Sequence, residues 1–96
     1  MSTTIPFTKM VGAGNDFLIV DTRARQLTLL GRAWPKISRV LCDRRQGIGA
    51  DGLLVLEGSK AAHVRMRVFN PDGSEAAMCS NGARCVALYL RGRETL

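Results

Sequence analysis

Two short apolar runs, each next to turn-forming residues, most constrain how this chain can fold. The first run, Phe17–Val20, lies between two aspartates, and the second, Leu53–Leu56, follows a glycine-rich loop. Apolar runs of this length between turn formers are typical of strands that are buried in a sheet. The sequence therefore predicts a largely buried strand over Asp16–Asp21 and a further strand over Leu53–Leu56.

The remaining pattern adds two more strands and two helices. Phe7–Val11 is a further predicted strand, and residues 63–69 alternate apolar and polar side chains, as a half-exposed strand does. Apolar residues spaced three to four apart predict helices over about Pro35–Asp43 and Ser80–Arg91. Asn70–Gly73 matches a β-turn. This order predicts an α+β fold in which the helices pack on one face of a mainly antiparallel sheet.

Length and composition predict one small globular domain over residues 1–96. Hydrophobic residues make up 46% of the chain, yet no stretch approaches the roughly 20 apolar residues that a membrane span requires. The N-terminus lacks a basic region followed by an apolar core, so no secretory signal is predicted. With an odd count of three cysteines, a disulfide framework is not expected. We therefore expect a cytoplasmic protein with no membrane partner.

The formal net charge of +6 is compatible with an acidic partner such as nucleic acid. A nucleic-acid footprint requires basic side chains that are clustered on one side. The basic residues are dispersed instead, and their longest run is the pair Arg44–Arg45. We expect no nucleic-acid partner, and a basic nucleic-acid binder remains as an alternative that salt-dependent binding would reveal.

Neither a cofactor nor a metal is expected. The glycine-rich segments 12–16 and 47–49 each lead into a strand, whereas a dinucleotide fingerprint follows a strand and opens a helix. Zinc-binding cysteines usually stand about two to four residues apart. Cys79 and Cys85 are further apart and fall on nearly opposite faces of a helix. Cys42 and Cys85 are most simply buried small hydrophobes.

The residues that could do chemistry lie where a turn meets the second predicted helix. Cys79 precedes Ser80 and Asn81 there. A cysteine at a helix start feels the positive end of the backbone dipole, which favours thiolate over thiol, and the free NH groups of that turn can hold an anion. The pattern suggests proton transfer on an acid-bearing substrate. The plainer alternatives are a buried helix-start cysteine at Cys79 and turn formers at Asn15 and Asn70.

Three segments together resemble diaminopimelate epimerase. They are Phe7–Phe17 (FTKMVGAGNDF), Gln46–Leu54 (QGIGADGLL) and Phe69–Cys85 (FNPDGSEAAMCSNGARC), in the family's order and spacing. The resemblance implies an isomerase of lysine biosynthesis that interconverts LL- and meso-diaminopimelate without pyridoxal phosphate. It also implies that residues 1–96 are the amino-terminal lobe of a two-lobed fold, truncated at the C-terminal end. For the full-length family enzyme it implies a homodimer.

The resemblance also assigns site residues. The family uses two cysteines on opposite sides of the substrate α-carbon, one as thiolate base and one as thiol acid, and Cys79 matches the cysteine of the amino-terminal lobe. Asn15 and Asn70 match residues that contact the substrate. Ser80 and Asn81 match the pair whose backbone lies by the α-carboxylate. These five positions are the expected catalytic and substrate-binding residues.

Two departures from the family pattern limit what this chain is expected to do. The family has Gly-Asn where this chain has Ser80-Asn81, and neither Cys42 nor Cys85 matches the partner cysteine. We therefore expect one half of a two-cysteine site and no epimerisation by these residues alone. The alternative is a non-catalytic lobe that binds a small acid or associates with a partner chain.

Overall fold

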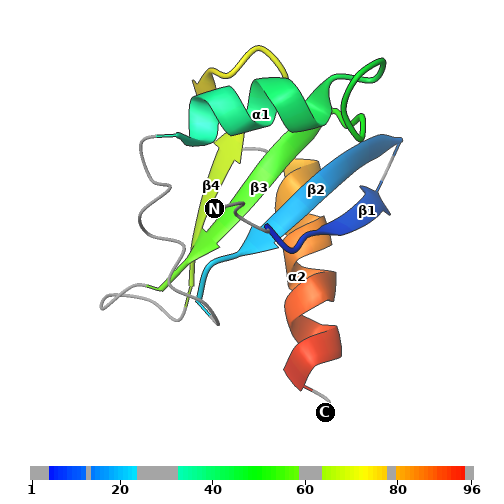
Figure 1. The fold of residues 1–96 in the computed structure, drawn as a ribbon. Helices are drawn as coiled ribbons and strands as arrows, with labels where there is room; N and C mark the ends of the chain where they lie inside the picture. The colour runs from blue at the N-terminus through cyan, green and yellow to red at the C-terminus, as the bar shows by residue number, and fades with distance from the viewer. Residues whose placement is uncertain (1–4, 13, 24–32, 59–63, 78–79, 95–96) are drawn as a thin grey trace.

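The computed structural model describes residues 5–12, 14–23, 33–58, 64–77 and 80–94, which form one mixed sheet and two helices (Figure 1). The strands follow one another across the sheet in chain order. Their bounds are Thr8–Gly12 for β1, Asn15–Asp21 for β2, Gly52–Glu57 for β3, Arg65–Phe69 for β4 and Glu75–Ala76 for β5. The helices are α1, Trp34–Cys42, and α2, Ser80–Glu94. Neither helix is long and apolar enough to cross a membrane.

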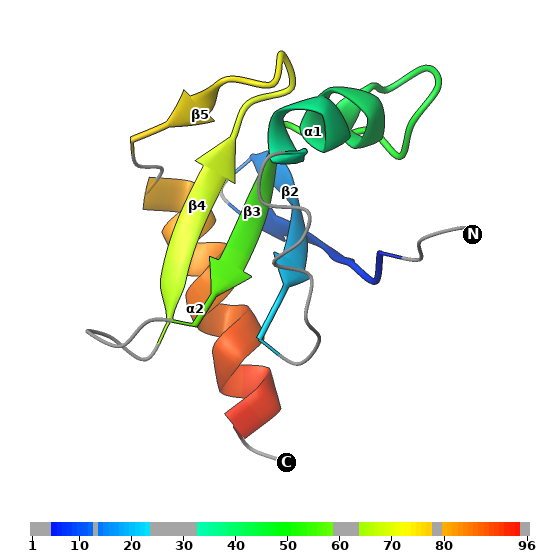
Figure 2. The ribbon, with the colours of Figure 1, turned by 60° about the vertical axis from the view of Figure 1, so that its left-hand side comes forward.

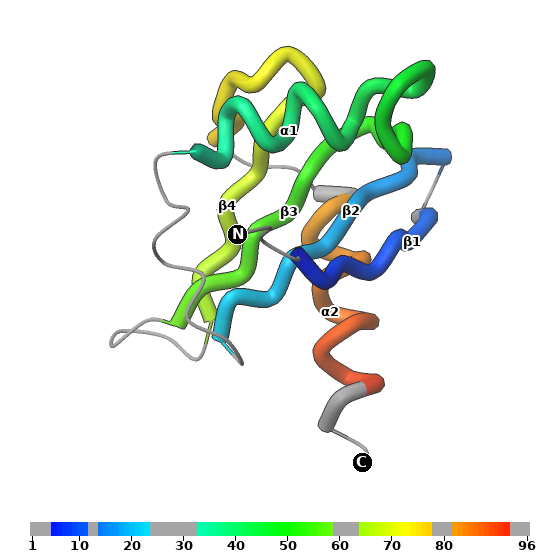
Figure 3. The backbone as a smooth tube through the Cα atoms, viewed as in Figure 1, coloured from blue at the N-terminus to red at the C-terminus, as the bar shows by residue number. Residues whose placement is uncertain are grey.

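The sheet is mainly antiparallel, as expected, with one parallel pair at its centre. β2 and β3 run parallel, with Ile19 opposite Leu54, while the other three neighbouring pairs are antiparallel. Figure 3 shows β3 lying between β2 and β4 along the path of the backbone. A parallel pair needs a long crossover connection, and α1 lies within the segment that connects β2 to β3. The α+β class is therefore confirmed.

The two helices cover opposite faces of the sheet, so the expectation that both pack on one face is wrong (Figures 1 and 2). On the α1 face, the core includes Leu18, Leu53 and Trp34. On the α2 face, it includes Ile19 and Leu54 from the same two strands. Because successive side chains of a strand point to opposite faces, a continuous apolar run makes both faces hydrophobic. One layer of helices could not have covered both.

The predicted element boundaries hold to within about three residues, and one short strand is new. The β-turn at Asn70–Gly73 is confirmed, since the Gly73 NH donates to the Asn70 carbonyl oxygen at 2.9 Å. β5 follows this turn and pairs with β4, with Ala76 opposite Val68. The predicted strand over 63–69 begins outside the described residues and is observed over Arg65–Phe69.

Candidate active site

A pocket forms at one edge of the sheet because three strand ends meet there. β2 and β3 run parallel, so their first residues, Asn15 and Gly52, lie at the same edge. β4 runs antiparallel to β3, so Asn70, which follows its last residue, lies at that edge too. The pocket has a volume of about 260 Å³ and is lined by Asn15, Phe17, Asp51, Gly52, Val68, Asn70 and Ala76.

The structure brings together two of the predicted substrate-contacting residues, Asn15 and Asn70, which both line this pocket. Ser80 is the first residue of α2 and Asn81 the second, so the predicted helix start is confirmed, and only their backbone is described. Ser80 follows the lining residue Ala76 by four positions, which limits the distance between their Cα atoms to about 14 Å. Cys79 lies outside the described residues.

The other two cysteines are buried, as expected. Cys42 is 2% exposed in the core on the α1 face, and Cys85 is 1% exposed in the core on the α2 face. Burial raises the pKa of the Cys42 thiol. No group of three potential metal ligands occurs within the described part of the chain.

Asn70 is held by its own turn and by α1. Its Nδ2 donates to Ser74 Oγ at 2.9 Å, and its backbone NH donates to the Ser74 carbonyl oxygen at 2.8 Å. The hydroxyl of Ser38, a fully buried residue of α1, donates to the Asn70 carbonyl oxygen at 3.2 Å. The turn is thereby fixed to the helix, while the Asn70 side chain stays exposed at the pocket.

Replacing Gly73 with alanine should loosen this turn and destabilise the chain by about 2 kcal/mol. Gly73 has a φ of 93°, and an added Cβ would lie 2.8 Å from the Pro35 carbonyl oxygen. The free energy of unfolding in urea, followed by circular dichroism, measures the effect. Gly58→Ala is the control, because no atom lies within 4 Å of a Cβ there. Equal losses in the two variants would contradict the proposed packing.

Asn15 is held by a cluster of charged groups that includes the lining residue Asp51. Its Nδ2 donates to Asp51 Oδ2 at 3.2 Å. The backbone NH of Asp16 donates to the same oxygen at 3.0 Å, and the Asp51 NH donates in return to Asp16 Oδ1 at 3.0 Å. Two carboxylates from separate segments are thus linked by reciprocal backbone hydrogen bonds.

One arginine forms an ion pair with both carboxylates. Arg44, just after α1, donates to the two carboxylate oxygens of Asp16 at 2.8 and 3.1 Å, and its Nη2 donates to Asp51 Oδ1 at 3.0 Å. The hydrogen bonds from Arg44 hold the pKa of Asp16 well below its usual range, against the opposing effect of desolvation. Lys9 Nζ lies 3.5 Å from Asp16 Oδ2 and adds a longer, weaker contact.

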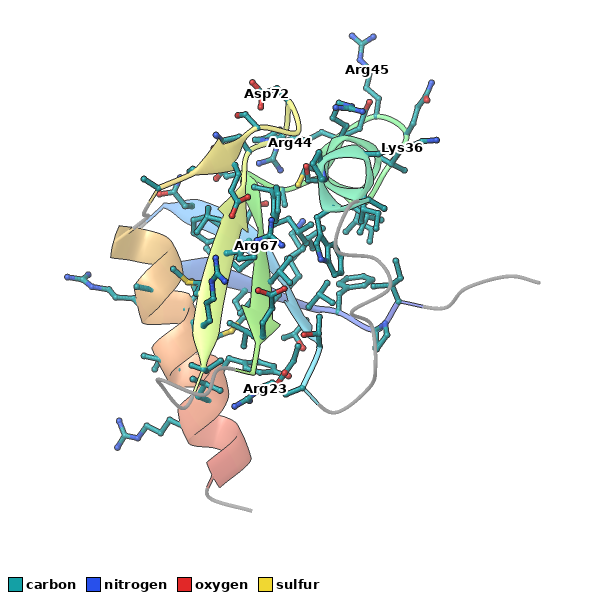
Figure 4. All side chains as sticks on the ribbon, turned by 90° about the vertical axis from the view of Figure 1, so that its left-hand side faces the viewer. Arg23, Lys36, Arg44, Arg45, Arg67 and Asp72 are labelled. Atoms are coloured by element: carbon teal, nitrogen blue, oxygen red, sulfur yellow. The ribbon has the colours of Figure 1, made fainter. Side chains whose placement is uncertain are left out.

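Asp51 and Arg44 were not among the predicted site residues. Asp51 lies in one of the three recognised segments, directly before a strand, which is where a lining residue could have been sought. Arg44 carried no such signal, since in the sequence it is one of many dispersed basic residues. Figure 4 shows the difference from its neighbour, because Arg45 extends outward while Arg44 lies against the body of the molecule.

Comparison with known proteins supports the family on sequence and the fold on structure. The model of the diaminopimelate epimerase family matches residues 7–95. A solved structure described as a Bacillus anthracis phenazine biosynthesis protein of the PhzF family superposes with a TM-score of 0.56 and 23% identity. That superposition covers 96% of this chain and 28% of the other chain, and it shows a shared fold alone.

Individual relatives are more similar in sequence. Diaminopimelate epimerase of Desulforudis audaxviator is 58% identical over 87 residues, which are 91% of this chain and 30% of the relative. The enzyme of Caldanaerobacter subterraneus subsp. tengcongensis is 51% identical over 84 residues, 88% of this chain and 28% of the relative. That of Archaeoglobus fulgidus is 48% identical over 86 residues. The chain thus spans about 30% of the length of such relatives. It belongs to the diaminopimelate epimerase family.

Proposed function

We propose that this chain supplies one side of the active site of a diaminopimelate epimerase, an isomerase of lysine biosynthesis that interconverts LL- and meso-diaminopimelate. The observation that carries the proposal is the pocket in which Asn15 and Asn70 meet. Each amide offers both donors and an acceptor, which suits the ammonium and carboxylate of an amino acid. The proposed enzyme uses neither pyridoxal phosphate nor a metal, and as a full-length family member it is a homodimer.

The start of α2 supports the proposed handling of the substrate carboxylate. The first NH groups of a helix have no acceptor in a preceding turn, so those of Ser80 and Asn81 can donate to a bound anion. A helical residue has a negative φ, which serine adopts without strain, so Ser80 is compatible with this role. Such donors stabilise the electron pair that the carboxylate takes up when the α-proton leaves.

Cys79 is the proposed base. Directly before α2, its thiol would meet the positive end of the helix dipole, which favours the thiolate. The thiolate takes the α-proton and becomes a thiol, the electron pair passes into the carboxylate, and an acid on the opposite face of the carbon returns a proton. Cys42 and Cys85 are both buried in the cores and do not line the pocket. Neither of these two cysteines is therefore proposed as the second acid.

Exchange of the α-proton in deuterated water tests the proposal, with pure LL- and meso-diaminopimelate as substrates. We expect the 96-residue chain to give no net epimerisation, and any exchange to be confined to one configuration. Cys79→Ser should abolish that exchange, whereas Cys85→Ala, folded by circular dichroism, should retain it. Robust exchange at both configurations would overturn the expected inactivity, and exchange that survives Cys79→Ser would overturn the role of Cys79.

A second candidate is a non-catalytic lobe that associates with a partner chain or binds a small acid. Val11 is 71% and Leu88 58% exposed, and a partner that covered these apolar side chains would remove them from water. Analytical ultracentrifugation separates the candidates, because a clean monomer at high protein concentration argues against association. The exchange experiment above then decides whether the chain acts on the substrate.

A further inference from the structure

Arg44 lies outside the pocket but contacts a residue of its wall. Asp51 lines the pocket and accepts from Arg44 Nη2, while Arg44 is not among the lining residues. Its guanidinium also donates to both carboxylate oxygens of Asp16 in a bidentate pair. A bidentate pair of this kind fixes the orientation of a carboxylate and also stabilises its negative charge. A lysine ammonium acts as a point charge and does not fix the orientation in this way. Arg44 thus fixes Asp16, whose backbone NH donates to Asp51 Oδ2, and it contacts Asp51 directly through one hydrogen bond at 3.0 Å.

Asp51 in turn decides which end of the Asn15 amide faces it. An ionised carboxylate only accepts hydrogen bonds, so the Asn15 side chain must turn its NH₂ group toward Asp51 Oδ2, as the 3.2 Å contact shows. The amide oxygen, Oδ1, is then directed away from Asp51. An amide oxygen has two lone pairs, so it can accept from a ligand ammonium in addition to any donor within the protein.

We infer that Arg44 is a positioning residue for Asn15: acting through Asp51, it fixes the amide so that the oxygen, and not the NH₂ group, is offered to a substrate ammonium. The inference rests on the proposed function, because that function supplies the ammonium. Without Arg44, two neighbouring carboxylates would repel each other, and among the described residues Lys9, 3.5 Å from Asp16, is the remaining ion-pair partner. Asp51 could then turn away, and the Asn15 amide would lose its fixed orientation.

Arg45 provides a matched control, since it carries the same charge one position further along. The described residues include no ion pair for Arg45, whereas Arg44 has one with each of two carboxylates. The side chain of Arg45 extends outward (Figure 4). Arg44→Gln and Arg45→Gln therefore change the net charge equally, and only the first removes the contact with Asp51.

The side-chain amide resonances of Asn15 in the ¹⁵N-labelled full chain test the inference without a ligand. In the parent and in Arg45→Gln, they should coincide at pH 7, because both proteins keep the hydrogen bond from Arg44 to Asp51. In Arg44→Gln, that contact is lost, so the resonances should be shifted at pH 7. If Arg44→Gln is folded and these resonances match the parent, the inference is wrong.

Titration with meso-diaminopimelate separates the inference from the proposed function. We expect Arg44→Gln to weaken binding by tenfold or more and Arg45→Gln by less than twofold. If the parent does not bind but its Asn15 resonances respond to Arg44→Gln as expected, the proposed function fails while the positioning role stands. Should Arg44→Gln not fold, Arg44→Lys and Asp51→Asn give the same readout, and unchanged Asn15 resonances in both would overturn the inference.

Discussion

Replacing Gly47 with alanine should destabilise the chain by about 3 kcal/mol or more. An added Cβ would collide with the Val40 carbonyl oxygen and would lie 2.8 Å from that of Leu41 and 2.9 Å from that of Asp43. All three atoms belong to the backbone at the end of α1, so no side chain can swing away to make room. Either the exit from the helix is rebuilt or the strain remains.

The unfolding midpoint should show this loss directly. For a domain of this size, 3 kcal/mol lowers Tm by roughly 12–24 °C. Gly92→Ala is the matched control, because it makes the same change in α2, where no atom lies within 4 Å of a Cβ. There alanine should raise stability by about 0.5–1 kcal/mol, since it favours a helix more than glycine does. A Gly47→Ala variant as stable as the parent would show that the exit from α1 differs from the structure described.

Replacing Trp34 with alanine should cost about 3–5 kcal/mol. The indole is fully buried between α1 and the sheet, where it packs with Leu18, Val55 and Phe69. Removing it leaves a cavity under the first turn of α1, the helix that holds Asn70 through Ser38. Because Trp34 is the single tryptophan, urea unfolding should be followed by circular dichroism and not by fluorescence.

Trp34→Phe keeps an aromatic ring at this position, whereas Trp34→Ala removes it. The indole Nε1 is buried without a hydrogen-bond partner in the described structure, so phenylalanine removes an unsatisfied donor as well as volume. We expect Trp34→Phe to retain more than half of the stability that Trp34→Ala loses. Equal losses in the two variants would mean that the aromatic ring does not support α1.

Local patterns predicted most of the fold because each continuous apolar run marks a strand that is buried on both faces of the sheet. Phe17–Val20 and Leu53–Leu56 became the central strands, and the spacing of apolar residues placed both helices. The prediction that both helices pack on one face was wrong. The spacing of apolar residues locates a helix along the chain, but the face that the helix covers depends on the assembled sheet. β5 was missed because its two residues, Glu75 and Ala76, carry no alternating pattern and are defined only by pairing with β4.

The site was predictable only as far as the family resemblance reached. Asn15 and Asn70 were predicted as substrate contacts, and the structure places both at one pocket. The role of Cys79 stays a prediction. Arg44 could not have been selected, because its partners Asp16 and Asp51 lie in other segments and meet it only after folding. Dispersed charges in a sequence carry no record of such pairs.

The parallel pairing of β2 with β3 sets the order in which the pocket can assemble. β1 pairs with β2, and β3 with β4, through contacts between consecutive strands that form at small entropic cost. Asn15 belongs to the first of these hairpins and Asn70 follows the second. Docking one hairpin on the other requires closing the long connection that contains α1, which is the slower, non-local event. Because the pocket takes lining residues from both hairpins, neither hairpin alone carries it.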